Sequence, residues 1–225
     1  MPENSDFYPQ VMQRYQTQPP PGEQSDFIHA LLRVFEEKVF NAKDFDSFPV
    51  ELIVDYIQRT HVYYLEKKLP EIEQSILLLS GHYEAQHPIL AALRNFFHRY
   101  VKDLSEHIQA EETLLLPYIN NLCEAGHSPD RFSRFLLHRQ EYSVGRFLND
   151  HHDTEDELKD IRQTIRLYEP PATNASLYRI LLLQLQVFEH DLSVHAHIEE
   201  EVLIPKAQKM EKQLDIQLQT LSPLN

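Results

Sequence analysis

The sequence predicts an all-α protein, an up-down-up-down four-helix bundle with a short N-terminal helical extension. Only 4 of the 225 residues are glycine and 25% are charged. Long segments are rich in Leu, Glu, Gln and Lys, which favour helix. Along these segments apolar residues recur at steps of three and four, as on the buried face of an amphipathic helix. Short segments with proline or glycine separate them, which is typical of antiparallel neighbours.

The N-terminal part is expected to differ from the bundle. The first 25 residues, which include a proline-rich stretch at 18–22, are interpreted as an extended arm. A short helix is predicted over residues 27–40, capped by Ser25 or Asp26. Its apolar side consists of Ile28, Leu31, Leu32, Phe35 and Val39.

Four long helices are predicted after this extension. The connections are a turn between residues 80 and 88, a second at 124–130, and a third at Pro170–Pro171. The helices span about 49–80 with a kink at Pro70, 88–123, 131–168, and from Asn174 or Ser176 to near Met210. The predicted organisation is an arm with a short helix at 1–48, a bundle at 49–212 and a tail at 213–225.

Charge and composition narrow the possible functions. The chain has 35 acidic and 21 basic residues, a formal charge of −14, which repels phosphate backbones and anionic lipid. Nucleic acid and membrane are therefore not expected as partners, and no apolar run approaches the roughly 18 residues of a membrane span. The first residues do not resemble a signal peptide. With Cys123 as the single cysteine, these features favour a reducing, cytoplasmic setting.

Two histidine–glutamate pairs interrupt the apolar stripes of the second and fourth helices. They are His107 with Glu111 and His195 with Glu199, and residues four apart share one helix face. Buried imidazoles and carboxylates need partners, and a metal satisfies all four at once. The stripes run through Leu93, Phe97, Tyr100, Leu104, Leu114 and Tyr118 in one helix, and Leu181, Leu185, Phe188, Leu192 and Val202 in the other.

Further histidines occur in the stripes of the other two helices. His61 lies among Val50, Ile53, Val54, Ile57, Tyr64 and Leu65 in the first helix. His151 and His152 lie in the third, where the apolar phase slightly favours His151. When the helices are folded back at the predicted turns, His61, His107, Glu111, His152, His195 and Glu199 come to one level.

Four imidazoles and two carboxylates in one layer suit two metal ions, each carboxylate bridging both. Mixed nitrogen and oxygen ligands stabilise ferrous and ferric ions, which favours a non-haem di-iron centre. A structural zinc site takes four ligands, often thiolates, so it fits this set less well.

Several segments of the chain resemble the hemerythrin-like di-iron proteins, specifically the branch called repair of iron centres, or iron–sulfur cluster repair proteins. The resemblance covers about residues 49–210 and is carried by THVYYLEKKLP, LSGHYEAQHP, SEHIQAEETLLLPYI, HHDTEDEL and HAHIEEEVLIPKA. It implies a four-helix bundle with two non-haem iron ions and a bridging oxo or hydroxo group. The implied ligands are His61, His107, Glu111, His152, His195 and Glu199, with Glu111 and Glu199 bridging.

Some assignments have alternatives. The His-Asp order of the family pattern favours His152 over His151 as the ligand. His197 and Glu201 form a competing pair one step round the last helix, or lie outward. His82 aligns with family histidines but is expected in the turn, far along the helix from His61. Many family members also carry an N-terminal domain with adjacent cysteines, and residues 1–48 contain none.

The resemblance implies a protein that reacts with dioxygen, nitric oxide or peroxide and assists the repair of iron–sulfur clusters under oxidative or nitrosative stress. Iron donation to apo iron–sulfur proteins, or a nitric oxide reductase or oxidase activity, would serve this role. The alternative hypothesis is a hemerythrin-like carrier or sensor of oxygen or nitric oxide. A ferritin-like oxidase is disfavoured because those sites use the order Glu-x-x-His.

Overall fold

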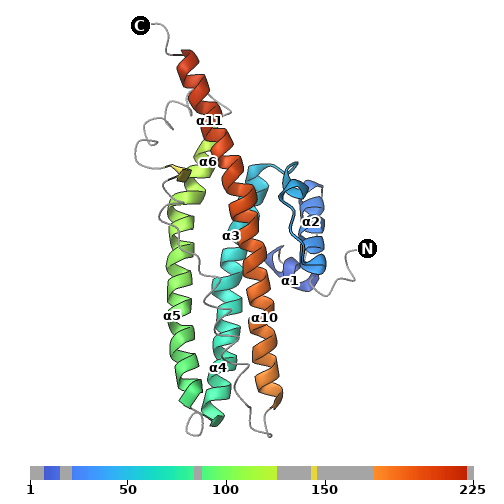
Figure 1. Cartoon of the computed structure of the whole chain (residues 1–225), viewed down its shortest axis with the longest axis vertical. Coiled ribbons are helices and arrows are strands. Elements are labelled where there is room, and N and C mark those ends of the chain that lie inside the picture. The colour runs from blue at the N-terminus through green and yellow to red at the C-terminus, as the bar shows by residue number, and fades with distance from the viewer. Residues whose placement is uncertain (1–7, 16–21, 84–87, 126–142, 146–174, 222–225) are drawn as a thin grey trace. The chain divides into compact units, whose positions relative to one another are not determined.

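A computed structural model describes residues 8–15, 22–83, 88–125, 143–145 and 175–221. These residues are mostly helical and contain no strand, which confirms the predicted all-α class (Figure 1). The predicted third helix at 131–168 lies almost entirely outside the described residues. The elements are α1 (Tyr8–Met12), η2 (Gln13–Tyr15), α2 (Glu23–Glu37), η3 (Ala42–Phe45), α3 (Val50–Tyr63), η4 (Tyr64–Lys68), α4 (Leu69–Tyr83), α5 (Pro88–Ala110), η5 (Glu111–Leu115), α6 (Leu116–Ala125), α10 (Ala175–Ile198), η7 (Glu199–Leu203) and α11 (Ile204–Leu221).

The chain divides into two compact units. The first unit is formed by Met1–Gln58, Gln109–His152 and Ala196–Asn225, and the second by Arg59–Ile108 and Asp153–His195. The divisions fall within α3, α5 and α10, so each of these helices contributes to both units. Each unit buries its own set of apolar side chains.

The core of the second unit forms where α4, α5 and α10 lie side by side (Figure 1). Each helix contributes apolar residues at steps of three and four, and burial of one such side chain is worth about 1.5–3 kcal/mol. Most of the predicted stripes on α5 and α10 are buried here. The buried cluster comprises Tyr63, Tyr64, Leu69, Ile72, Ile76, Leu79, Leu90, Leu93, Phe97, Tyr100, Leu104, Ile108, Tyr178, Leu181, Leu185, Phe188 and Leu192.

Part of the predicted extended arm is helical. Val11, Met12 and Tyr15 are buried on α1 and η2, so the expectation of an extended arm is wrong for Tyr8–Tyr15. The physical reason is that these apolar side chains recur at helical spacing, and a core is available for them to pack into.

Helix α2 starts and ends earlier than predicted. It begins after Gly22, whose positive φ of 68° suits glycine, so Ser25 and Asp26 lie in its first turn instead of capping it. It ends at Lys38, which has left-handed backbone and donates its N–H to the carbonyl of Val34. Val39 therefore lies beyond the helix and is 65% exposed, contrary to its predicted inward position.

An aromatic cluster anchors α2 within the first unit. The ring of Phe27 lies edge-on to Phe45, Phe48 and Tyr56, at centroid distances of 5.6, 5.2 and 5.5 Å. Such aromatic pairs contribute about 0.5–1.5 kcal/mol beyond the area they bury. Lys206 on α11 donates hydrogen bonds to two carbonyls of the same region, of Asp46 at 2.8 Å and Phe48 at 3.0 Å. Residues 22–48 are therefore packed firmly within the first unit.

Three of the long helices contain a π-turn, a feature that the sequence analysis did not predict. In each turn a backbone N–H bonds to the carbonyl five residues earlier, and a proline follows at once. Proline has no N–H and its ring clashes with the carbonyl four residues earlier in an α-helix, so a wider turn relieves the clash. The N–H donors are Leu69, Leu116 and Ile204, the acceptors Tyr64, Glu111 and Glu199, and the prolines Pro70, Pro117 and Pro205.

The π-turns change which residues face the core. Leu114 was predicted inward but is 50% exposed, whereas Leu115 is fully buried. Leu65 was also predicted inward and is 37% exposed, and the next buried residue after Tyr64 is Leu69. Both predictions are wrong because they assume an ordinary helix, and a π-turn takes up about one additional residue.

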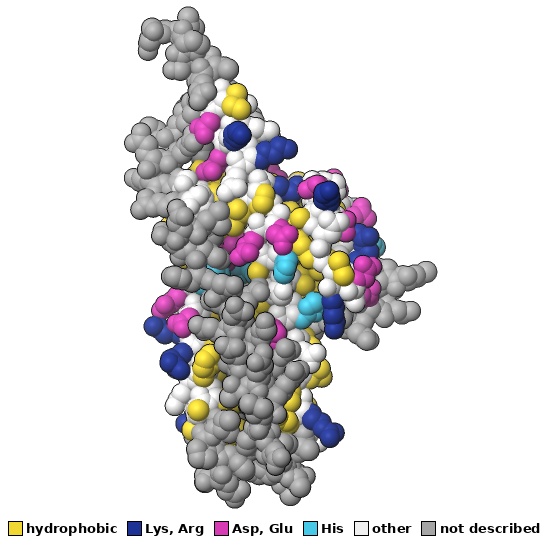
Figure 2. Space-filling view, in the orientation of Figure 1, with side chains coloured by type: hydrophobic (Ala, Val, Ile, Leu, Met, Phe, Trp, Pro, Cys, Tyr) yellow, Lys and Arg dark blue, Asp and Glu magenta, His cyan; other side chains and the backbone are white. Residues whose placement is uncertain are grey.

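Two helices extend beyond their predicted ends. The first continues from the π-turn to Tyr83, so Ser80 lies within α4 and not in the predicted turn. The last continues past Met210 to Leu221. Among the described residues, no helix is both long and apolar enough to cross a membrane. Acidic and basic side chains are interspersed over α2 and α11 on the face that Figure 2 shows.

We predict that Pro205→Ala keeps the π-turn and changes the free energy of unfolding by less than about 1 kcal/mol. An alanine N–H bonded to the Glu201 carbonyl would contribute only about 0.5–1.5 kcal/mol. Returning to an α-turn would shift buried Leu203 out of the core at about 1.5–3 kcal/mol. Leu203→Ala should instead lower the free energy of unfolding by about 2–5 kcal/mol. A crystal structure of Pro205→Ala with an α-turn at Glu199–Leu203 would contradict this prediction.

Candidate metal site

Four of the predicted ligands are buried ionisable side chains. His61 and Glu111 are each 1% exposed, Glu199 is 2% exposed and His195 is 7% exposed. Burying such groups costs free energy unless they are paired or bind a metal. Their burial therefore marks this region as a candidate functional site.

Two of these side chains, His61 and His195, meet within the second unit. His61 comes from α3 and His195 from α10, and their ring centroids are 5.1 Å apart. The ring of Tyr64 lies edge-on to His195 at 5.7 Å, and Phe188 lies edge-on to Tyr64 at 5.1 Å. The two imidazoles are thus adjacent and bordered by aromatic rings.

The two glutamates interact within the first unit. The pKa of Glu199 lies well above its usual range, chiefly because burial removes water from its carboxyl. The negative charge of Glu111 is the second cause, and a hydrogen bond between the two carboxyls and the charge of Glu200 add to it. Without a cation, therefore, the pair retains a proton.

Each glutamate is also the first residue of a π-turn. The carbonyls of Glu111 and Glu199 accept the N–H groups of Leu116 and Ile204, five residues later. π-turns occur frequently at functional sites. Gln58 on α3 donates a hydrogen bond of 3.1 Å to Glu112, within the first of these turns.

Each unit offers donors suited to a cation. The second unit offers the adjacent imidazoles of His61 and His195, and the first offers the paired carboxyls of Glu111 and Glu199. Imidazole and carboxylate together suit iron and other transition metals. The residues present therefore fit a metal ion.

A thiolate ligand is not part of this donor set. Cys123 is buried, and desolvation together with the nearby Glu51 carboxylate raises the pKa of its thiol to about 12. The thiol is therefore protonated at neutral pH. Among the described residues, the two buried donor pairs therefore offer only nitrogen and oxygen atoms.

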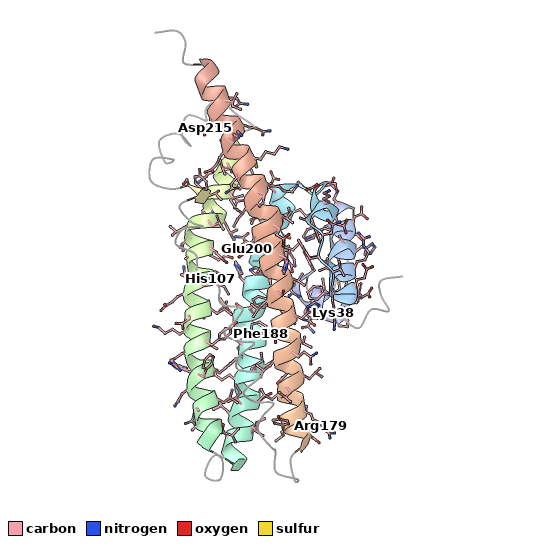
Figure 3. All side chains as sticks on the ribbon, viewed as in Figure 1. Lys38, His107, Arg179, Phe188, Glu200 and Asp215 are labelled. Atoms are coloured by element: carbon pink, nitrogen blue, oxygen red, sulfur yellow. The ribbon has the colours of Figure 1, made fainter. Side chains whose placement is uncertain are left out.

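The remaining predicted ligands are placed differently. His107 is half-buried on α5 (Figure 3) and stands four residues before Glu111. Glu199 contacts Glu111 within the first unit. His151 and His152 lie outside the described residues, so the choice between them stays open and the six-ligand set stays a prediction.

The competing histidines occupy other environments. His197 is half-buried, with its Nε2 3.8 Å from the carboxyl of exposed Glu201, and its ring lies 5.0 Å from that of Phe40. The ring of His197 thus contacts the N-terminal segment within the first unit. His82 lies in the last turn of α4 and not in the predicted turn after it.

Two polar residues beside the histidines were not recognised from the sequence. The Tyr64 hydroxyl donates a buried hydrogen bond of 3.0 Å to Asp191, and Asp191 is fully buried. Tyr64 was counted only as an apolar stripe residue. The available signal was the spacing of Asp191, which stands four residues before His195 and so shares its helix face.

Comparison with known proteins supports a cation site. The family described as the hemerythrin HHE cation-binding domain matches residues 53–207. The iron-sulfur cluster repair protein ScdA of Staphylococcus haemolyticus (strain JCSC1435) is 22% identical over 154 residues, which are 68% of this chain. The match spans 65% of that relative's length. Because the family match covers more than half of the chain, this protein belongs to the hemerythrin HHE cation-binding domain family.

Proposed function

We propose that this protein is a non-haem di-iron protein that assists the repair of iron–sulfur clusters by donating iron. The observation that carries the proposal is the burial of two donor pairs, His61 with His195 and Glu111 with Glu199. The family's cation-binding character and the repair role in the name of the relative ScdA add support. Apo iron–sulfur proteins are the partners proposed for this chain.

The proposed ligands are the four buried side chains together with two further histidines of the predicted set. Nitrogen and oxygen donors without thiolate suit iron in both its ferrous and ferric states. When bound, iron would supply reactivity toward dioxygen, nitric oxide or peroxide. The full proposed set is His61, His107, Glu111, His152, His195 and Glu199.

The glutamate pair gives the site a way to hold and to release a cation. Glu111 and Glu199 lie in contact, and burial favours a protonated Glu199 when no cation is present. A cation must displace that proton, so uptake is coupled to proton release. Protonation of the pair assists the reverse step, release of the cation. A site of this kind is suited to donating its metal.

We predict that the metal-free protein loses stability as pH rises from about 4.5. The folded-state pKa of Glu199 is raised, so the folded protein binds a proton that the unfolded chain has already released. The stability that this proton contributes is fully present below the pKa of Glu199 in the unfolded chain. It is lost as pH rises through the raised pKa of Glu199 in the folded protein. Glu199→Gln mimics the protonated carboxyl. At pH 8 it should raise the free energy of unfolding by about 1–3 kcal/mol, the penalty of a poorly compensated buried polar group.

Urea denaturation of metal-free wild type and Glu199→Gln at several pH values measures this effect. The exposed neighbour Glu200 provides the matched control, because Glu200→Gln should leave most of the pH dependence in place. Equal stability of wild type and Glu199→Gln at pH 8 would show that the carboxyl pair holds no proton in the folded state.

We predict that Glu111→Ala and Glu199→Ala each lower the iron content of protein purified from iron-replete cells from two equivalents to one or fewer. Each substitution removes a carboxylate proposed to bridge two ions. Elemental analysis measures the content, and Mössbauer spectroscopy measures coupling between the irons. Glu112→Ala and Glu200→Ala are the matched controls, one residue away and more exposed. Two coupled irons in both ligand variants would exclude the bridging assignment.

We predict that the iron-loaded protein restores an apo iron–sulfur protein faster than an equal amount of free ferrous iron does. Recovery of the cluster's visible absorption, with ⁵⁷Fe followed into the acceptor, measures this transfer. Glu199→Ala should reduce the transfer in proportion to its iron content. Retention of all ⁵⁷Fe, together with a stable and reversible dioxygen adduct, would instead identify a carrier.

A further inference from the structure

Three helices carry the same arrangement of residues around their π-turns, which gives their sequences a common register. Tyr64, Glu111 and Glu199 are each the first residue of a π-turn, and a proline stands six residues after each of them. In this register Tyr64 occupies the position at which the other two helices carry a proposed bridging glutamate. The sequence alone does not show this equivalence, because it depends on where the wide turns begin.

The histidines support the same register. His107 and His195 stand four residues before their glutamates, whereas His61 stands three residues before Tyr64. Residues three and four apart lie on one helix face. On the first helix His61 and Tyr64 therefore share one face, as the histidine and the glutamate of each pair do on the other two helices.

Tyr64 makes its contacts within the second unit, and one of them is with His195. Its side chain is 1% exposed, and its hydroxyl donates a 3.0 Å hydrogen bond to Oδ1 of Asp191. Its ring lies edge-on to the imidazole of His195 at 5.7 Å, with an angle of 69° between the planes. Phe188 lies edge-on to Tyr64 at 5.1 Å and borders the ring on another side.

Asp191 ties this arrangement to the helix that carries His195. It is fully buried on α10, one helical turn before His195. A buried carboxyl requires hydrogen-bond donors, and the phenol of Tyr64 supplies one. The hydrogen bond thus holds the Tyr64 ring against α10, beside the imidazole of His195.

We propose that Tyr64 is a positioning residue of the metal site. Held by Asp191, its ring sets the orientation of His195, and it does so at the position where the other two helices present a carboxylate. The inference rests on the proposed metal-binding function but not on the role in cluster repair. It gives the first helix a part in the site beyond His61.

Tyr64→Phe tests this role because it removes only the hydroxyl that Asp191 holds. Groups that orient metal ligands typically change metal affinity about 10- to 100-fold when they are substituted. We expect Tyr64→Phe to weaken Fe(II) binding about 10-fold or more, measured by anaerobic titration. Asp191→Asn keeps an oxygen that accepts from the phenol, so it should bind Fe(II) within about 3-fold of wild type.

Tyr100→Phe is the matched control. Tyr100 is also 1% exposed, belongs to the same core cluster and lies about two helical turns before His107. The same change there should leave Fe(II) affinity unchanged. Thermal unfolding of both metal-free variants checks that they remain equally folded.

The metal-free protein provides a second readout. Because Tyr64 is proposed to orient His195, Tyr64→Phe should shift the imidazole ¹⁵N resonances of His195, and Tyr100→Phe should not. Unchanged His195 resonances and unchanged Fe(II) affinity in Tyr64→Phe would overturn the proposal. So would a visible absorption band of the iron-loaded protein that Tyr64→Phe abolishes, because the phenolate would then be a ligand itself.

These readouts separate the two proposals. Wild-type protein that binds Fe(II) but donates none to an apo iron–sulfur protein would refute the role in cluster repair, while the Fe(II) affinities and the His195 resonances would still support or overturn the positioning role. Wild-type protein that binds iron with an affinity equal to that of Tyr64→Phe, with His195 unaffected, would overturn the positioning role alone.

Discussion

The structure depends on the burial of ionisable side chains within a helical core. His61, Glu111, His195 and Glu199 are almost inaccessible to solvent, and each is costly to bury without compensation. The apolar side chains of the two units supply the stability that tolerates this cost. At the proposed metal site, a bound cation would remove part of this cost, because it would replace the proton held between Glu111 and Glu199 with a more favourable positive charge. Folding and cation binding would thereby be coupled in one set of residues.

The π-turns allow buried glutamates and buried apolar side chains to occur in the same helices. The glutamates Glu111 and Glu199 each begin a wide turn, after which the apolar residues continue in a shifted phase. Leu115 is buried as a result and Leu114 is not. The prolines make a wide turn acceptable, since they have no N–H to lose. The core on both sides then holds the turn in place, because the packing of several apolar side chains outweighs one backbone hydrogen bond.

Supporting contacts surround the buried ionisable side chains within each unit. In the second unit Tyr64 and Asp191 border His195 through a hydrogen bond and an edge-on ring contact. In the first unit the N-terminal segment, which lacks cysteine, packs through its aromatic cluster and through Lys206 on α11. Its contact with His197 brings it next to the helix that carries Glu199. The segment is thus part of the folded unit, which leaves its biochemical role as a separate question from that of a cysteine-bearing domain.

The sequence alone determined the all-α class, most of the apolar stripes and the inward direction of the buried ligands, because these follow from local helical periodicity. Tertiary structure decided what periodicity does not encode. The π-turns moved Leu114 outward, and packing within the first unit favoured a helical conformation for Tyr8–Tyr15. The pairing of Tyr64 with Asp191 joins residues 127 positions apart. Such long-range contacts depend on how helices pack, and no local pattern of residues specifies them.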